Sequence, residues 1–184
     1  MVHQDQYLAE VFSQPPLTGF KRQQNIRNYL VRAQLPKPES KYPKRILKGM
    51  KRCGNNCTAC PFILEGKNVK IDKKTDWKIS TAATCNSFNV VYMIECQKET
   101  CKMRYVGETK RTLKLRLADH RGYVTKNDTT QATGAHFCLP GHSLSDMKVT
   151  VLEKVKKHND QYRKKREEYL IQKFNTMNKG LNRK

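Results

Sequence analysis

Acidic side chains are scarce in this sequence. Of its 184 residues only 16 are Asp or Glu, whereas 37 are Lys or Arg, and the formal net charge is +21 at pH 7. Such a surplus favours a polyanionic partner, and nucleic acid is the default polyanion for a small basic protein. We therefore expect DNA as the partner, held through contacts to its phosphate backbone.

Long apolar runs are absent as well. No stretch approaches the roughly 20 apolar residues that a transmembrane helix needs, and no signal-peptide pattern is present. No basic amphipathic helix with a Trp and Leu face stands out, so we expect no membrane partner. The expected location is inside the cell, in the nucleus. In a reducing compartment the seven cysteines, an odd number, are better explained as metal ligands or buried thiols than as a disulfide framework.

The first part of the chain, residues 1–50, reads as a basic and partly disordered extension. Apolar residues at helical spacing predict one short helix in it, at 25–33. Residues 35–48 are rich in Pro and Lys and predict an extended linker. This linker either lies along a phosphate backbone or is merely solvated.

Residues 51–84 form a Cys-rich, irregular linker. Two short strand-like pieces in it, 68–72 and 77–80, predict a hairpin that returns the chain. Residues 85–184 are long enough for one compact domain.

Within that domain three segments predict strands. Residues 90–94 (VVYMI) are continuously apolar, which is typical of a strand buried on both faces. Residues 103–106 follow after a short polar turn, and residues 146–155 carry alternating apolar side chains. The sequence predicts an α+β fold: a small, mainly antiparallel, three-stranded sheet flanked by helices, preceded by the Cys-rich extension.

One flanking helix is predicted after Gly107, with Thr109 as its N-cap. Leu113 and Leu117 mark its apolar face, and Arg116 and His120 lie on or beside the same stripe. Two basic groups directed toward a core indicate a site, because buried charges need partners. The alternative, without a functional role, is that Arg116 and His120 lie on an edge of the helix that faces solvent.

A second helix is predicted at 160–176, with Leu170, Ile171 and Phe174 as its apolar stripe. At about 100° per residue Glu167 falls in the middle of this stripe, whereas Glu168 points away. A carboxylate in such a position needs a cation to compensate it. That cation is either a metal ion or the side chain of a neighbouring arginine, Arg166 or Arg116.

Two groups of cysteine and histidine have spacings that suit zinc, which structural sites bind through four ligands. Cys53, Cys57 and Cys60 form a C-x3-C-x2-C run, and Cys85 is the nearest candidate for the fourth ligand. Free thiols in a loosely packed extension are the alternative. The second group combines a C-x4-C pair, Cys96 and Cys101, with an H-x5-H pair, His136 and His142, and Cys138 remains as a spare thiol.

Several of these segments resemble one family. VVY at 90–92 and YVG at 105–107 resemble the paired motifs of GIY-YIG nucleases, although Val-Val-Tyr stands where the family name has Gly-Ile-Tyr. Arg116 has the spacing of the family's arginine, and the closing Gly-Leu-Asn at 180–182 is similar to its last motif. Together with YVGET and the Cys pairs, the chain looks like the GIY-YIG endonuclease module of Penelope-like retroelements. The resemblance covers residues 85–184 well and the linker loosely.

The resemblance implies a divalent-metal-dependent DNA endonuclease that nicks a phosphodiester bond. Glu167 would hold Mg²⁺ or Mn²⁺, Arg116 would contact the phosphate, and Asn182 would support the site. Oxygen ligands suit these hard cations, and a guanidinium suits a phosphate. The resemblance also supports zinc at the Cys-Cys-His-His set, and it supports the linker cysteines as a cluster without identifying their metal.

For the general base the resemblance implies a motif tyrosine, Tyr92, with Tyr105 orienting water or phosphate. A free phenol has a pKa near 10, so the metal and Arg116 would have to lower it. His120 is a candidate proton shuttle or phosphate contact, and the alternative is a purely structural histidine.

Three functions remain open. The chain is a retroelement-derived endonuclease, a catalytically idle nucleic-acid-binding zinc module of the same origin, or a zinc-stabilised interaction domain whose charge serves only solubility. Penelope-like proteins carry this module after a reverse transcriptase, for which 184 residues leave no space. The expectation is therefore a linker and nuclease without the polymerase.

Overall fold

The computed structural model describes residues 19, 48–54, 56–72, 74–155 and 159–183. The chain divides into two units, 1–44 and 45–184, and apart from residue 19 all described residues belong to the second. The predicted helix at 25–33 and nearly all of the predicted linker at 35–48 lie outside the described residues.

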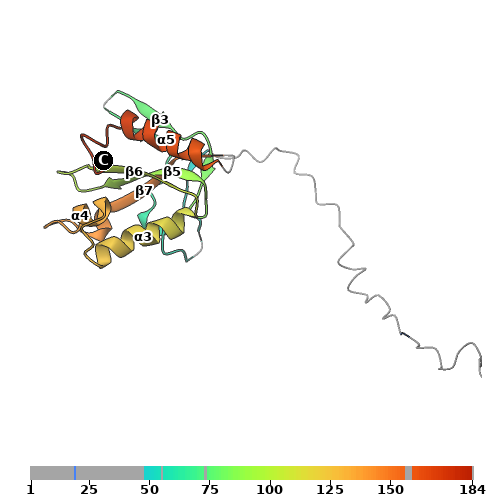
Figure 1. The fold of residues 1–184 in the computed structure, drawn as a ribbon, viewed down its shortest axis with the longest axis horizontal. Coiled ribbons are helices and arrows are strands. Elements are labelled where there is room, and N and C mark those ends of the chain that lie inside the picture. Colours follow the sequence, from blue (N-terminus) through green and yellow to red (C-terminus); the bar gives the residue numbers. More distant parts are fainter. Residues whose placement is uncertain (1–18, 20–47, 55, 73, 156–158, 184) are drawn as a thin grey trace, which may run out of the picture. The chain divides into compact units, whose positions relative to one another are not determined.

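A three-stranded antiparallel sheet with the order β6-β5-β7 forms the centre of the second unit. Its strands are β5 (Val90–Cys96), β6 (Arg104–Thr109) and β7 (Met147–Lys154), at the three predicted places. Almost every residue of β5 is buried, as expected for a central strand covered on both faces. Figure 1 shows α5 (Asp160–Lys173) on one side of this sheet and α3 (Leu113–Thr125) and α4 (Ala132–Phe137) on the other.

The predicted N-cap of α3 is wrong. Thr109 is the last residue of β6, where it pairs with Val90, and the cap position belongs to Thr112. The strand continues because its ladder with β5 stabilises these residues more than an earlier helix start would. The short helix α4, between the YVG strand and the last strand, was not predicted, because its six residues carry too little periodicity.

The linker adds small elements around the domain. They are β1 (Gly49–Met50), paired in parallel with β4 (Ala82–Ala83), and β2 (Asn68–Lys70), paired antiparallel with β3 (Asp76–Lys78). The β2–β3 hairpin lies where the two strand-like pieces were predicted. Two single 3₁₀ turns, η2 (Cys60–Phe62) and η3 (Leu144–Asp146), complete the described elements.

The hairpin and the domain are joined by side chains. The indole of Trp77 donates to the carbonyl of Leu152 over 2.9 Å, and Arg104 donates to the carbonyl of Lys70 over 2.7 Å. The core is therefore continuous from the linker into the sheet, and buried residues of both parts belong to one cluster. None of the helices in the described part of the chain is long and apolar enough to cross a membrane.

Candidate active site and metal centres

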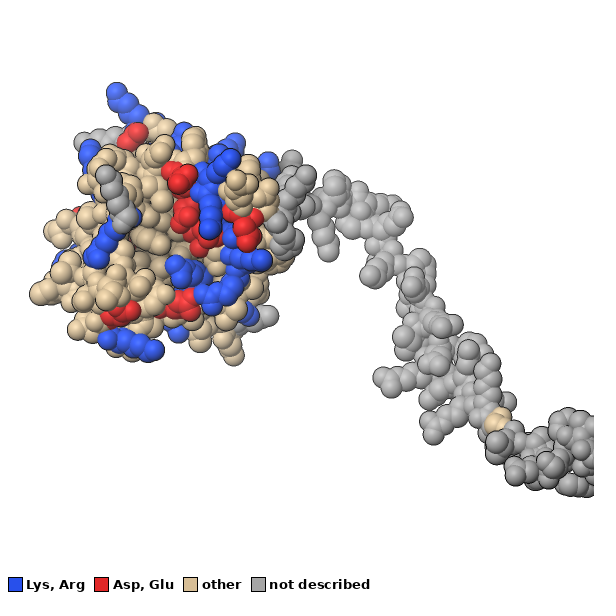
Figure 2. All heavy atoms as spheres, viewed as in Figure 1, with Lys and Arg blue, Asp and Glu red and all other residues tan. Residues whose placement is uncertain are grey.

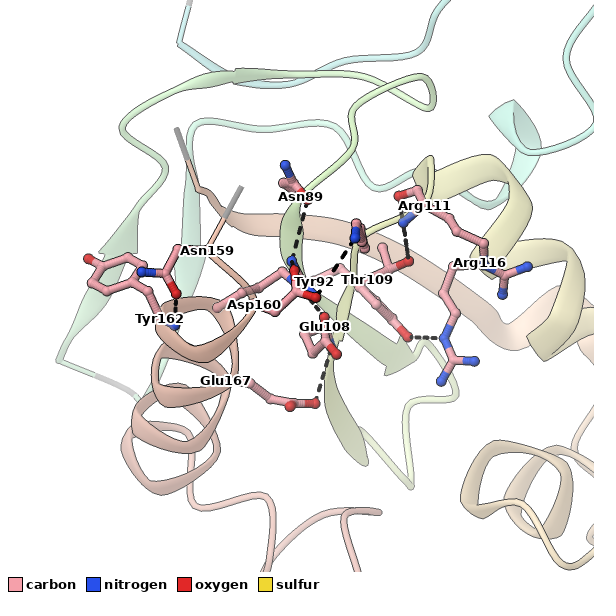
Figure 3. Close-up of polar contacts among 12 residues, drawn as sticks. Asn89, Tyr92, Glu108, Thr109, Arg111, Arg116, Asn159, Asp160, Tyr162 and Glu167 are labelled. Carbon is pink, nitrogen blue, oxygen red and sulfur yellow. Dashed lines mark hydrogen bonds and ion pairs between the residues drawn. The ribbon is translucent and has the colours of Figure 1, made fainter. Parts of the chain in front are cut away.

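The hydroxyl of Tyr92 is the centre of a buried hydrogen-bond network. It accepts a hydrogen bond from Nε of Arg116 over 2.9 Å (Figure 3), and it lies 2.7 Å from Nε2 of His120. The other ring nitrogen of His120, Nδ1, lies 2.9 Å from Oγ1 of Thr133. One strand and two helices thus contribute to a continuous chain of polar contacts: Tyr92 from β5, Arg116 and His120 from α3, and Thr133 from α4.

Glycine makes this arrangement possible. Gly107 is the cross-strand partner of Tyr92, and a Cβ placed on it would lie 2.8 Å from the Tyr92 hydroxyl and 2.7 Å from Cε1 of Tyr105. Any other residue would therefore push the two phenol rings away.

Burial sets the protonation states in this network. It raises the pKa of Tyr92 far above its ordinary value, and the positive charge of Arg116 offsets only part of this effect. Burial, helped by the charge of Arg116, lowers the pKa of His120 to about 3. Tyr92 is therefore a neutral phenol and His120 a neutral imidazole at pH 7. The expected lowering of the Tyr92 pKa by Arg116 is outweighed by desolvation.

Glu167 lies on the inner side of α5, and its Oε1 accepts a hydrogen bond from the backbone N–H of Glu108 over 3.1 Å (Figure 3). Burial raises the pKa of this carboxyl, and the negative charge of Glu108 raises it further. No Lys or Arg among the described residues forms an ion pair with it. Of the two arginines considered as its partner, Arg166 pairs with Glu153 at 2.7 Å, and Arg116 forms no ion pair with Glu167, although its positive charge favours the ionised carboxylate and so opposes the rise of its pKa.

Most of the predicted site residues line one pocket of about 350 Å³. Tyr105 comes from β6, Glu167 from α5, and Asn182 from the segment after α5. Tyr92 does not line the pocket itself. Its hydroxyl makes hydrogen bonds with two side chains that do, those of Arg116 and His120. The predicted residues that face the pocket are Tyr105, Arg116, His120, Glu167 and Asn182.

Asn182 attaches the C-terminal segment to the outer edge of β6. Its side-chain amide donates to the carbonyl of Val106 over 2.8 Å, and its carbonyl accepts from the Val106 N–H over 2.9 Å. The preceding turn needs glycine, because a Cβ on Gly180 would lie 2.4 Å from the carbonyl oxygen of Arg104. These contacts give a physical reason for the Gly-Leu-Asn motif.

Sequence reasoning missed two charged residues that hold the site together. Arg163, only 3% exposed, forms an ion pair with Glu108 and lies 3.4 Å from Oδ1 of Asn89. Its position four residues before Glu167, on the same helix face, was the available signal. Thr133 was also missed, because a lone threonine in a loop-like segment carries no pattern.

The linker cysteines converge as predicted from their spacing. The Sγ atoms of Cys53, Cys57, Cys60 and Cys85 all lie within 4.8 Å of one another. Cys60 is 3.5 Å from Cys53 and 3.6 Å from Cys85, close to the roughly 3.8 Å edge of a tetrahedron with Zn–S bonds of about 2.3 Å. Burial raises the pKa of Cys60, but hydrogen bonds from Gly54 and Cys53 outweigh this and lower it to about 7. A thiolate there suits a metal.

The second group also converges, from the end of β5, the following turn, α4 and the loop after it. The ligand atoms of Cys96, Cys101, His136 and His142 lie within 4.8 Å of one another. Sγ of Cys101 is 3.5 Å from Nε2 of His136, which matches a shared tetrahedral ion. Both ring nitrogens of His142 are buried without a hydrogen-bond partner among the described residues. A metal would satisfy one of them. Cys138 contacts the carbonyl of Val124 instead.

Two tyrosines, an arginine, a glutamate and an asparagine thus come together at one pocket beside the sheet. A comparison with family models identifies the domain: the GIY-YIG catalytic domain matches residues 88–182. The chain therefore belongs to the GIY-YIG family, a nuclease superfamily whose members act on nucleic acid and generally use a divalent metal. No curated protein and no solved structure matches the chain.

Proposed function

We propose that this protein is a DNA endonuclease that nicks one strand by hydrolysing a phosphodiester bond with Mg²⁺ or Mn²⁺. The observation that carries the proposal is one pocket that gathers a guanidinium, a tyrosine and a carboxylate without an ion pair among the described residues, each from a different element. A net charge of +21 supports a polyanionic substrate.

Glu167 is the proposed metal ligand. Its carboxylate borders the pocket, lacks an ion pair among the described residues, and sits beside a second negative charge, that of Glu108. Such a group suits a hard cation that keeps most of its waters. The bound ion would neutralise charge on the scissile phosphate and on the leaving oxygen.

Arg116 is the proposed phosphate ligand. One guanidinium nitrogen, Nε, is committed to Tyr92, and Nη1 lies 3.7 Å from Asp119. The side chain is 25% exposed, so its outer nitrogens remain able to donate to a phosphate oxygen in the pocket. Because Nε is fixed on the phenol, the planar fork is held in one orientation before the substrate arrives.

Tyr92 is the proposed general base, in its phenolate form. A bound cation and the Nε–H of Arg116 would stabilise this phenolate against its burial. His120, in the neutral tautomer that carries its proton on Nε2, donates to the same oxygen, while its Nδ1 accepts from the hydroxyl of Thr133. The phenolate takes a proton from the attacking water, whose oxygen bonds to phosphorus as the bond to the leaving oxygen breaks and solvent protonates that oxygen. Tyr105, which lines the pocket, orients this water.

We further propose structural zinc at the two cysteine-containing clusters, an origin in a Penelope-like retroelement, and action on DNA in the nucleus. The tetrahedral spacing of the sulfur and nitrogen atoms supports the first part. The resemblance of the motifs supports the second. The third follows from the choice of DNA as substrate.

Nicking of supercoiled plasmid in Mg²⁺ tests this function, with Glu167→Gln as the variant. We expect a rate loss of at least about 100-fold, because the metal's contribution of several kcal/mol disappears. Glu168→Gln is the matched control, since it removes the same charge from the exposed neighbouring position and should nick normally.

Equal nicking by wild type and Glu167→Gln would refute the metal assignment. A wild-type protein that binds DNA with a steep salt dependence but never nicks would instead be the idle nucleic-acid-binding module. If the protein showed no salt-dependent binding to DNA, only the third function, a zinc-stabilised interaction domain, would remain.

A further inference from the structure

The outer face of α5 exposes two aromatic side chains on an otherwise basic surface. Tyr162 is 47% and Tyr169 is 42% exposed. Arg166 and Lys173 lie between and beyond them at helical spacing, so all four share one face of the helix. We call this set, Tyr162, Arg166, Tyr169 and Lys173, the aromatic–basic stripe.

Two cations lie close to one ring of the stripe, that of Tyr169. The guanidinium carbon of Arg166 is 4.6 Å from the ring centroid of Tyr169. Nζ of Lys173 lies 5.6 Å from the same centroid and 5.7 Å from that of Trp77 on β3. These contacts place positive charge beside the Tyr169 ring, which stays 42% exposed.

The packing of α5 does not use the two tyrosines of the stripe. A face about 100° round the helix carries the buried residues Arg163 and Leu170, together with Phe174 just after its end, and Glu167 also lies on that side. The two phenol rings therefore add little to the core, although tyrosines on a helix surface leave apolar area in water.

Charge alone does not explain this surface. Where Figure 1 draws α5, Figure 2 shows Lys and Arg interspersed with Asp and Glu. Part of the negative charge is compensated, since both carboxylate oxygens of Glu153 accept hydrogen bonds from Arg166. A duplex, which presents phosphates but no free base faces, would gain little from the tyrosines. Unpaired bases can stack on them while neighbouring cations hold the phosphates.

We propose that the aromatic–basic stripe binds single-stranded nucleic acid, with unpaired bases stacked on Tyr162 and Tyr169 and the backbone held by Lys173. This site lies on the side of α5 away from the pocket, and its binding does not depend on hydrolysis. A nuclease with such a site would favour substrates that carry a single-stranded segment next to the duplex to be cut.

Fluorescence anisotropy with the full-length chain tests the proposal, using a labelled oligothymidine, a duplex of equal length, and no added Mg²⁺ or Mn²⁺. The variant Tyr162→Ala/Tyr169→Ala should bind the single strand about 30-fold more weakly, because two stacking contacts are lost. Duplex affinity should change less than about twofold, and the salt dependence of binding should keep its slope, because no charge is removed.

The pair Tyr162→Phe/Tyr169→Phe is the matched control and should retain single-strand affinity, since the ring faces remain. Circular dichroism and the melting temperature check folding, which two exposed residues should not affect. Unchanged single-strand affinity in the alanine variant would overturn the proposal. Equal weakening for single strand and duplex would overturn it too, and would indicate general electrostatic binding. Neither result depends on nicking, so this test stands apart from that of the proposed endonuclease.

Discussion

The phenol of Tyr92 and the imidazole of His120 lie 2.7 Å apart in a part of the domain that solvent barely reaches. Both residue types are common on protein surfaces, where neither would have unusual chemistry. Here burial keeps both uncharged, and each has one further partner: Arg116 donates to Tyr92, and Thr133 lies within hydrogen-bond distance of His120. At the scale of the residue, the surroundings of a side chain therefore decide more than its type.

The low pKa of His120 predicts acid destabilisation. Its folded-state pKa of about 3 is below the ordinary value of about 6.5, so the unfolded chain binds more protons between these values. Stability is complete above about pH 6.5 and is lost as the pH falls toward 3. For this residue the free energy of unfolding should fall by about 2 kcal/mol between pH 7 and pH 5.

Urea unfolding at both pH values, compared between wild type and His120→Gln, measures this effect. The double difference removes the contributions of other histidines, such as His136, whose pKa is also lowered by burial. An equal pH dependence in the two proteins would show that His120 is not the group responsible.

At the scale of the element, the pairing of β5 with β6 positions the two tyrosines. Tyr92 on the central strand faces Gly107 on the edge strand, and Asn182 bonds to the outer edge of β6 at Val106. The C-terminal segment thereby continues the hydrogen bonding of an edge strand that would otherwise expose its backbone. The pocket thus lies at one point along β6, where this strand, the helices α3 and α5 and the segment after α5 come together.

Gly107→Ala should disturb the pocket beside β6 more than the rest of the fold. The added Cβ would meet Tyr105 at 2.7 Å and Tyr92 at 2.8 Å, so the rings must shift. We expect a loss of about 1–3 kcal/mol in stability from overpacking and at least a tenfold loss of nicking. Gly122→Ala on α3 is the matched control, because nothing lies within 4 Å of its Cβ, and it should stabilise the helix by up to about 1 kcal/mol. Normal nicking by Gly107→Ala, measured on plasmid, would contradict the proposed role of the two tyrosines.

At the scale of the whole molecule, the two clusters of possible metal ligands bring distant segments together. The first joins the linker to Cys85, just before β5, and the second joins the end of β5 to α4 and the loop after it. If zinc occupies both, each ion replaces packing that so small a domain lacks, since a core of this size gives limited stability.

Elemental analysis of the purified protein should find about two zinc ions per chain, one for each cluster. Cys57→Ser and Cys101→Ser should each lose one ion and lower the melting temperature. Cys138→Ser, which lies outside both clusters, should keep both ions and serves as the control. Full zinc content in Cys57→Ser or Cys101→Ser would remove the corresponding assignment.

The sequence by itself determined the strands β5 and β7, the helix α5 and the orientation of Glu167. The apolar run at 90–94, the alternation at 146–155 and the helical stripe around Glu167 are local patterns, and the structure has β5, β7 and α5 at these places. Such patterns can be read because side-chain periodicity of 2 or 3.6 residues depends only on the neighbours along the chain.

Only the tertiary structure decided which residues meet. The pairing of Arg163 with Glu108, the strand that runs through Thr109, and the contact of His120 with Thr133 all join residues whose partners lie on other elements. The burial that shifts the pKa values of Tyr92 and His120 is likewise a sum over the whole core. These features depend on long-range packing and desolvation free energies, which no pattern of adjacent residues contains.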